Sequence, residues 1–257
     1  MNPKIAKELL NILKITKEER RNAESKRGDF LQILIEAAEK EKTNGLMHLD
    51  DITIDAQLFL FLTAGYETSS TLLSFGVHTL AVKPDLQEKL REHIQEVTNG
   101  RELSYDLLTE LTYLEAFLLE TLRLHPPIGR VERKCTKDYI LPGTNITINI
   151  GDVIAIPIYG IHMDPEIYPD PYEFRPERFM GDEKKNRPSH LYWAFGAGPR
   201  NCIGTRFAMV AAKIAMVSLL RNFKFSACKK TQNPVKIDKV SVLLKPESGL
   251  WVKIEKL

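Results

Sequence analysis

The chain has 257 residues, with 36 Lys and Arg against 34 Asp and Glu, so its formal net charge is only +2. This balance excludes a protein held on nucleic acid mainly through phosphate contacts. Hydrophobic residues make up 43% of the chain and charged residues 27%, a mixture that excludes disorder and a bare coiled coil. We therefore expect a globular chain with one large core over residues 1–257.

Up to about Leu124 the apolar residues recur with helical spacing. Asp29 and Ser104 are placed to cap helices, and Pro84 to open one. The predicted helices cover residues 5–13, 30–38, 51–83, 84–97, a short one after Ser104, and 111–124. The first 21 residues alternate charged with apolar side chains and lack the continuous apolar run of a signal peptide or membrane anchor.

After Pro126 the composition changes. The segment from Pro126 to Gly204 holds 10 of the 14 prolines and 8 of the 14 glycines, which predicts turns and short strands. β-Branched residues predict a hairpin within 144–158 and a terminal hairpin within 235–254, and a helix returns at 204–220. The expected fold class is mainly α with small β elements.

Three cysteines, Cys135, Cys202 and Cys228, are widely spaced and form no C-x-x-C pair, which argues against a disulfide framework or a structural zinc site. Cys202 stands in the glycine-rich string Phe195 to Gly204, directly before an apolar helix. A helix dipole there favours a thiolate, and Arg200 could pair with an acidic group of the same ligand. For a lone cysteine the alternative is a buried thiol in a glycine turn.

A second signal lies in the long predicted helix, where Ala64, Gly65, Glu67 and Thr68 interrupt the apolar run. Glycine and hydroxyl side chains in a helix can open a local bulge. An acid beside an alcohol suits proton delivery to a dry site. The alternative is an exposed glutamate with hydroxyls bonded to their own helix.

A third signal is the acid–base pair Glu120 and Arg123, three residues apart on one predicted helix. An exposed pair of this kind contributes only about 0.3–0.5 kcal/mol and is weak support for any role.

Together these strings resemble the cytochromes P-450. The sequence F-x-x-G-x-R-x-C-x-G at Phe195 to Gly204 resembles their haem-ligand loop. The resemblance implies that Cys202 is the axial thiolate ligand of the iron in haem b, with Phe195 and Gly196 in the loop against the ring. It also implies that Arg200 and Arg133 contact the haem propionates. For Arg133 the alternative is a salt bridge at the surface.

The resemblance extends to the other two signals. Ala64 to Ser69 resembles the family's A-G-x-[DE]-T-[TS] motif on the distal side of the haem. This implies that Ala64 and Gly65 contact the haem and that Glu67 and Thr68 organise protons. Glu120 and Arg123 resemble the family's E-x-x-R, and Arg178 in Pro176–Phe179 resembles the third member of a Glu–Arg–Arg network behind the haem loop.

The resemblance covers the chain from about Asp29 to its end and is to the C-terminal half of eukaryotic microsomal members, insect or animal. It implies a monooxygenase that inserts one oxygen atom of O2 into an apolar organic substrate. The electrons would come from NADPH through a flavoprotein reductase. The family's anchor, early sheet and pocket roof have no counterpart here, so membrane association at the cytosolic face of the endoplasmic reticulum would come through that missing N-terminal part.

Two alternatives stay open. One is a truncated haem-binding fragment without its own catalysis. The other is a haem-thiolate isomerase or dehydratase, which has less use for the Glu67–Thr68 pair. Since helices that would face the missing part are apolar, we expect the 257 residues alone to aggregate or bind haem loosely.

Overall fold

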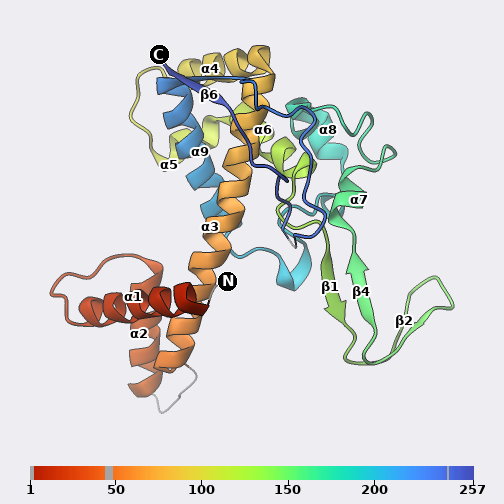
Figure 1. The fold of residues 1–257 in the computed structure, drawn as a ribbon. Coiled ribbons are helices and arrows are strands. Elements are labelled where there is room, and N and C mark those ends of the chain that lie inside the picture. The colour runs from red at the N-terminus through yellow and green to blue at the C-terminus, as the bar shows by residue number, and fades with distance from the viewer. Residues whose placement is uncertain (1–2, 44–48, 242) are drawn as a thin grey trace. The chain divides into compact units, whose positions relative to one another are not determined.

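The computed structural model describes residues 3–43, 49–241 and 243–257. The chain separates into two compact units, Met1–Glu67 and Thr68–Leu257, and the long helix α3 (Asp51–Val82) contributes to both. Figure 1 shows the elements of each unit. The single domain expected over residues 1–257 stays a prediction.

The first unit is built from α1 (Pro3–Arg21), α2 (Phe30–Thr43) and the first part of α3. Asp29 caps α2 as predicted, because its Oδ1 accepts the Gln32 N–H at 3.1 Å. The rings of Phe30 and Phe61 stack with centroids 4.0 Å apart. Buried Lys17 of α1 donates to Asp55 Oδ1 of α3 at 2.6 Å. An ion pair and apolar packing therefore hold this unit together.

The helical core of the second unit comes from the end of α3 together with α4 (Pro84–Thr98), α6 (Thr112–Leu124) and α9 (Thr205–Asn222). Pro84 opens α4, and Ser104 Oγ caps the short α5 (Tyr105–Glu110) by accepting the Leu107 N–H at 3.2 Å. The core side chains include Leu72, Leu80, Leu90, Ile94, Leu114, Phe117, Leu118, Met216, Val217 and Leu220. These helices match the sequence prediction closely.

The long helix differs from expectation in two ways. It ends at Val82, one residue early, because Lys83 precedes Pro84 and adopts φ −126°, ψ 77°, outside the helical region. The local bulge expected around Ala64–Ser69 does not form, since residues 51–82 are α-helical throughout. A hydroxyl in this helix bonds within it: Thr63 Oγ1 donates to the Phe59 carbonyl at 2.9 Å, which needs no opening of the helix.

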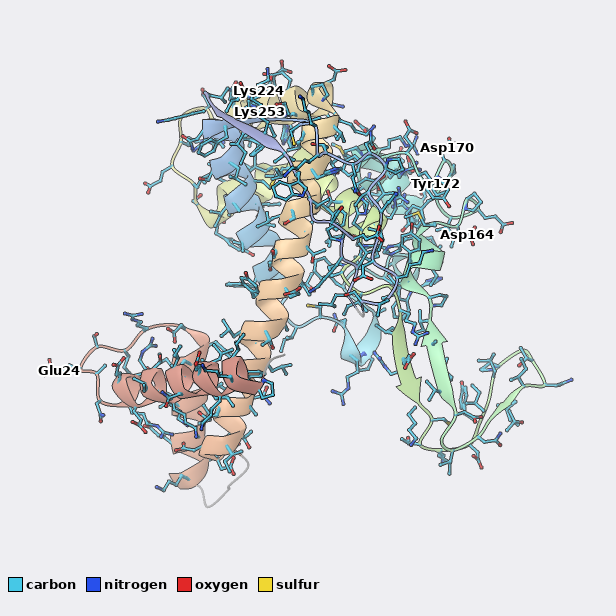
Figure 2. The ribbon with its side chains drawn as sticks, in the orientation of Figure 1. Glu24, Asp164, Asp170, Tyr172, Lys224 and Lys253 are labelled. Atoms are coloured by element: carbon cyan, nitrogen blue, oxygen red, sulfur yellow. The ribbon has the colours of Figure 1, made fainter. Side chains whose placement is uncertain are left out.

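The described strands form antiparallel pairs. They are β1 (Val131–Lys134) with β4 (Val153–Ile156), β2 (Tyr139–Ile140) with β3 (Thr147–Ile148), and β5 (Phe223–Ser226) with β6 (Lys253–Lys256). Lys224 and Lys253, labelled in Figure 2, lie on the last of these pairs. With the helices dominating, the expected mainly α class with small β elements is confirmed.

The hairpin predicted within 144–158 is wrong. Its two halves, β3 and β4, pair with the earlier strands β2 and β1 instead of with each other. The turn between them bonds back to Cys135, whose N–H donates to Asp152 O at 2.8 Å and whose carbonyl accepts the Gly151 N–H at 2.9 Å. Gly151, at φ +98°, allows that turn.

The terminal hairpin predicted within 235–254 forms only in part. Inside this segment the Asp238 N–H donates to the Lys245 carbonyl at 2.9 Å and the Glu247 N–H donates to the Lys236 carbonyl at 2.8 Å, around an antiparallel bridge. The last residues of the segment form β6, which pairs with β5 directly after α9. Buried Gln87 of α4 covers the other edge of β5, donating to the Phe225 carbonyl at 2.8 Å and accepting its N–H at 2.9 Å. The tail between them shows the isolated bridges Ile128↔Leu243 and Ile237↔Pro246. Residue 242, part of this prediction, lies outside the described residues.

An irregular stretch connects β4 to α9. It contains α7 (Ile158–His162), the short 3-10 turn η1 (Pro176–Phe179), α8 (Gly181–Asn186), and two further 3-10 turns, η2 (Ser189–Leu191) and η3 (Gly198–Arg200). Asp164, Asp170 and Tyr172, labelled in Figure 2, lie between α7 and η1. No helix among the described residues is both long and apolar enough to cross a membrane.

Candidate haem site

The cysteine loop is a tight structure that presents one thiol in front of α9. The Cys202 N–H donates to the Phe195 carbonyl at 2.7 Å, which closes the loop. Gly196 has φ +71°, a conformation that favours glycine. Thr205 Oγ1 donates to the Cys202 carbonyl at 2.9 Å at the start of α9. The loop backbone is therefore held at both ends while the Cys202 side chain stays exposed.

The thiol opens into a cleft of about 230 Å³ in the second unit. The cleft walls come from α3, α6, β1, α7 and the cysteine loop, and most of them are apolar. The residues that define the cleft chemically are Thr68, Leu72, Leu122, Val131, Arg133, Phe195, Gly196, Arg200 and Cys202. One thiol, the hydroxyls of Thr68 and Ser69, and two guanidinium groups thus share an apolar cleft.

This set of side chains fits a haem. The cleft offers Cys202 as one soft donor, which suits a haem iron because the porphyrin ring supplies further ligands to the metal. Apolar walls suit a flat hydrocarbon ring, and Arg133 and Arg200 suit carboxylates at its edge. A Cβ on Gly196 would meet Asn201 Cα at 3.5 Å, an ordinary contact, so its φ of +71° and not a lack of space favours glycine in the loop.

Behind the cleft, Glu120, Arg123 and Arg178 form a network whose side chains are 0% exposed. Arg123 holds the Glu120 carboxylate with two bonds, from Nε at 2.7 Å and from Nη2 at 2.9 Å. Arg178 Nε lies 3.4 Å from Glu120 Oε1, and the Arg175 N–H donates to the same oxygen at 2.9 Å. We call these three charged residues the Glu–Arg–Arg network.

The network also holds the irregular stretch in place. Arg123 donates to the carbonyls of His162 and Glu173, at 2.8 Å and 3.2 Å. Arg178 donates to the Asp170 carbonyl at 2.8 Å. Burial lowers the pKa of Arg178, and the Glu120 carboxylate opposes that shift. Residues 120–123, 162 and 170–178 therefore converge on one buried network of charges.

The comparisons with known proteins identify the family. A family model described as "Cytochrome P450" matches residues 2–253. The chain belongs to the cytochrome P450 family. It is 44% identical over 245 residues to the fruit fly (Drosophila melanogaster) protein "Probable cytochrome P450 6a14", which covers 90% of this chain and 48% of that protein.

Mammalian relatives are similarly close. The chain is 43% identical over 245 residues to "Cytochrome P450 3A6" of rabbit (Oryctolagus cuniculus), covering 95% of this chain and 48% of that protein. It is 42% identical over 241 residues to human (Homo sapiens) "Cytochrome P450 3A5", covering 93% and 47%. The chain thus spans about half the length of the curated relatives it matches, and membership of the family implies a haem-iron cofactor.

The structure of this P450 chain gathers half of the sequence-predicted site residues in one cleft, and Glu120, Arg123 and Arg178 in the buried network. Six of the predicted residues line the cleft together: Thr68, Arg133, Phe195, Gly196, Arg200 and Cys202. Ala64, Gly65 and Glu67 lie up to one turn earlier on α3, in the first unit, and are not among the cleft residues. The roles given to all of these residues, and to the Glu–Arg–Arg network, stay predictions.

Sequence reasoning missed His162, the last residue of α7, which is 0% exposed beside Arg123. Its Nδ1 lies 3.1 Å from the Arg123 carbonyl, and its Nε2 accepts the Trp193 N–H at 2.9 Å. Burial lowers the pKa of His162 to about 4, and the Arg123 charge acts in the same direction. A single histidine in a proline-rich stretch gives no sequence signal, because both of its partners are backbone groups.

Proposed function

We propose that this chain is the thiolate-bearing part of a monooxygenase that holds haem b and inserts one atom of O2 into an apolar organic substrate. The observation that carries the proposal is the cleft in which the Cys202 thiol and the Thr68 hydroxyl stand among apolar walls. The similarity to insect and mammalian P450s over most of the chain supports it.

The chain's own residues would hold the cofactor. Cys202, fixed through its backbone N–H and carbonyl, would bind the iron as a thiolate. Arg133 and Arg200 would pair with the carboxylates of the ring, and Phe195 and Gly196 would lie against its face. When bound, the haem supplies the iron centre at which dioxygen is activated.

Proton supply would come from α3. Thr68 places a hydroxyl in the cleft, and Glu67 is its neighbour on the helix. A hydroxyl can accept a proton from one side and donate one to the other, which suits a relay in a water-poor site. Leu72 and Leu122 would exclude bulk water, so that protons arrive only through such groups.

The partners follow from the same proposal. Electrons would come from NADPH through a flavoprotein reductase, and the whole polypeptide would work at the cytosolic face of the endoplasmic reticulum membrane. The names of the insect and mammalian relatives support a P450 of this general kind. The substrate would be an apolar small molecule, consistent with the apolar walls of the cleft.

The first test uses the full-length polypeptide loaded with haem, reduced and exposed to carbon monoxide. A thiolate ligand gives a strongly red-shifted absorption band. Cys202→His should lose that band because imidazole donates less charge to iron, while Cys135→Ser and Cys228→Ser should keep it. A red-shifted band in Cys202→His would place the ligand elsewhere and refute the assignment.

The second test separates the reactions. With reductase and NADPH, a monooxygenase consumes O2 and forms an oxygenated product in step with NADPH oxidation. An isomerase or dehydratase converts an organic peroxide with neither NADPH nor reductase. Peroxide conversion without NADPH-linked product would replace the proposed reaction with that alternative.

A further inference from the structure

His162 joins the Glu–Arg–Arg network to the chain that leads into the cysteine loop. Each ring nitrogen bonds a backbone group from a different segment: Nδ1 faces the Arg123 carbonyl at 3.1 Å, and Nε2 faces the Trp193 N–H at 2.9 Å. One segment is the end of α6 and the other immediately precedes the loop. The imidazole therefore bridges the two by hydrogen bonds alone.

These partners fix the position of the ring proton. A carbonyl can only accept and a backbone N–H can only donate, so the ring must donate from Nδ1 and accept at Nε2. A ring protonated on both nitrogens would set its Nε2–H against the Trp193 N–H. The bridge thus requires one neutral tautomer, which few other side chains can imitate.

The ring is also held against rotation. It stacks on Tyr192, with centroids 5.3 Å apart and planes 12° apart, and meets the Tyr168 ring edge-on at 6.1 Å. Its own carbonyl accepts from Arg123 Nη1 at 2.8 Å, so His162 and Arg123 bond each other in both directions. His162 is therefore a rigid extension of the network.

From Trp193 the connection continues to the thiol through short backbone contacts. The Trp193 carbonyl accepts the Gly196 N–H at 2.9 Å, and the Phe195 carbonyl accepts the Cys202 N–H at 2.7 Å. The first bond ties the loop to the residue before it, and the second lies within the loop. Freeing the Trp193 N–H would loosen the first of these anchors.

We propose that His162 is a positioning residue that ties the Glu–Arg–Arg network to the cysteine loop and thereby holds Cys202 in place as a ligand. This inference rests on the proposed thiolate role of Cys202. The side chain would act by keeping Trp193, and through it the loop, from shifting. It would touch neither cofactor nor substrate.

The test compares three proteins at full length: wild type, His162→Phe and Gln87→Met. Phenylalanine keeps the stacked ring but leaves the Trp193 N–H and the Arg123 carbonyl unpaired. The control breaks the buried amide bonds of Gln87 to Phe225, away from the cleft. The first measurement is amide hydrogen exchange of residues 193–202, which does not need bound haem. The second is the fraction of haem that gives the red-shifted carbon-monoxide band.

In His162→Phe we expect exchange of residues 193–202 to be about tenfold faster, with much of the red-shifted band converted to the unshifted form. Gln87→Met should leave both unchanged. Unchanged exchange and an unchanged band ratio in His162→Phe would overturn the inference. If wild type itself lacked the red-shifted band, the proposed function would fail, while the exchange experiment would still decide whether His162 holds the loop.

If His162→Phe does not fold, two amide variants decide the question. His162→Gln places an amide oxygen where Nε2 accepts, and His162→Asn places an amide N–H where Nδ1 donates. The inference expects the glutamine variant to keep more of the red-shifted band than the asparagine variant, because the loop bonds to Nε2. Equal loss in both would overturn it.

Discussion

Removing Arg123 should test the Glu–Arg–Arg network most directly. Arg123→Ala deletes two bonds to the Glu120 carboxylate, at 2.7 and 2.9 Å, and leaves the carbonyls of His162 and Glu173 without these donors. Breaking a buried ion pair costs about 3–5 kcal/mol. Because Arg178 and the Arg175 N–H still reach the carboxylate, we expect a value near the lower end, about 3 kcal/mol.

The effect is large compared with the about 5–15 kcal/mol that stabilises a whole domain. A loss of about 3 kcal/mol in the free energy of unfolding corresponds to a more than hundredfold decrease in the folding equilibrium constant. It should lower the urea concentration at the unfolding midpoint by about 1 M. The assay is urea unfolding of the full-length polypeptide followed by circular dichroism, with haem content measured in parallel. Haem content should fall with stability, because the network supports the segments behind the cleft.

Lys185→Ala is the matched control. Lys185 and Asp182 have the same three-residue spacing in α8 but are exposed, and their charged atoms lie 3.7 Å apart. Their loss should change stability by no more than about 0.5 kcal/mol. If Arg123→Ala behaved like Lys185→Ala, with normal haem content, the charges of the network would be water-screened and its structural role would be refuted.

Three further outcomes follow from the structure. Thr68→Ala should keep haem but divert electrons from NADPH into hydrogen peroxide. The control Ser70→Ala, on the exposed side of α3, should not increase hydrogen peroxide formation. If Thr68→Ala left the ratio of product to NADPH unchanged, Thr68 would be only a packing residue. The pKa of His162 is lowered from 6.5 to about 4, so its contribution to stability is complete above about pH 6.5 and is lost as pH falls towards 4, by about 3 kcal/mol. Urea unfolding across this range should show a slope that His162→Gln flattens; an equal slope in the variant would contradict this. The isolated 257 residues should aggregate, because the side chains of Ile203 and Phe207, close to the thiol in sequence, are 86% and 79% exposed. A monodisperse, haem-loaded monomer in size-exclusion chromatography would disprove this prediction.

Local signals predicted the helices well, because their causes lie within a few residues. Pro84 at a first turn and the caps Asp29 and Ser104 act on the adjacent backbone. Strand partners were not predictable in this way. The β-branched residues of 144–158 form strands, but which strand each one pairs with depends on a turn that bonds back to Cys135.

The same distinction between local and tertiary causes applies to the candidate site. By itself the sequence determined the family resemblance and the choice of Cys202, since the glycines, Arg200 and the cysteine stand in one short string. Only the tertiary structure brought Thr68 and Arg133 into the same cleft, buried Glu120 with two arginines, and placed His162 between Arg123 and Trp193. The physical reason is that His162 recognises backbone groups, which every residue carries, so its partners are set by the packing of distant segments and leave no pattern in the sequence.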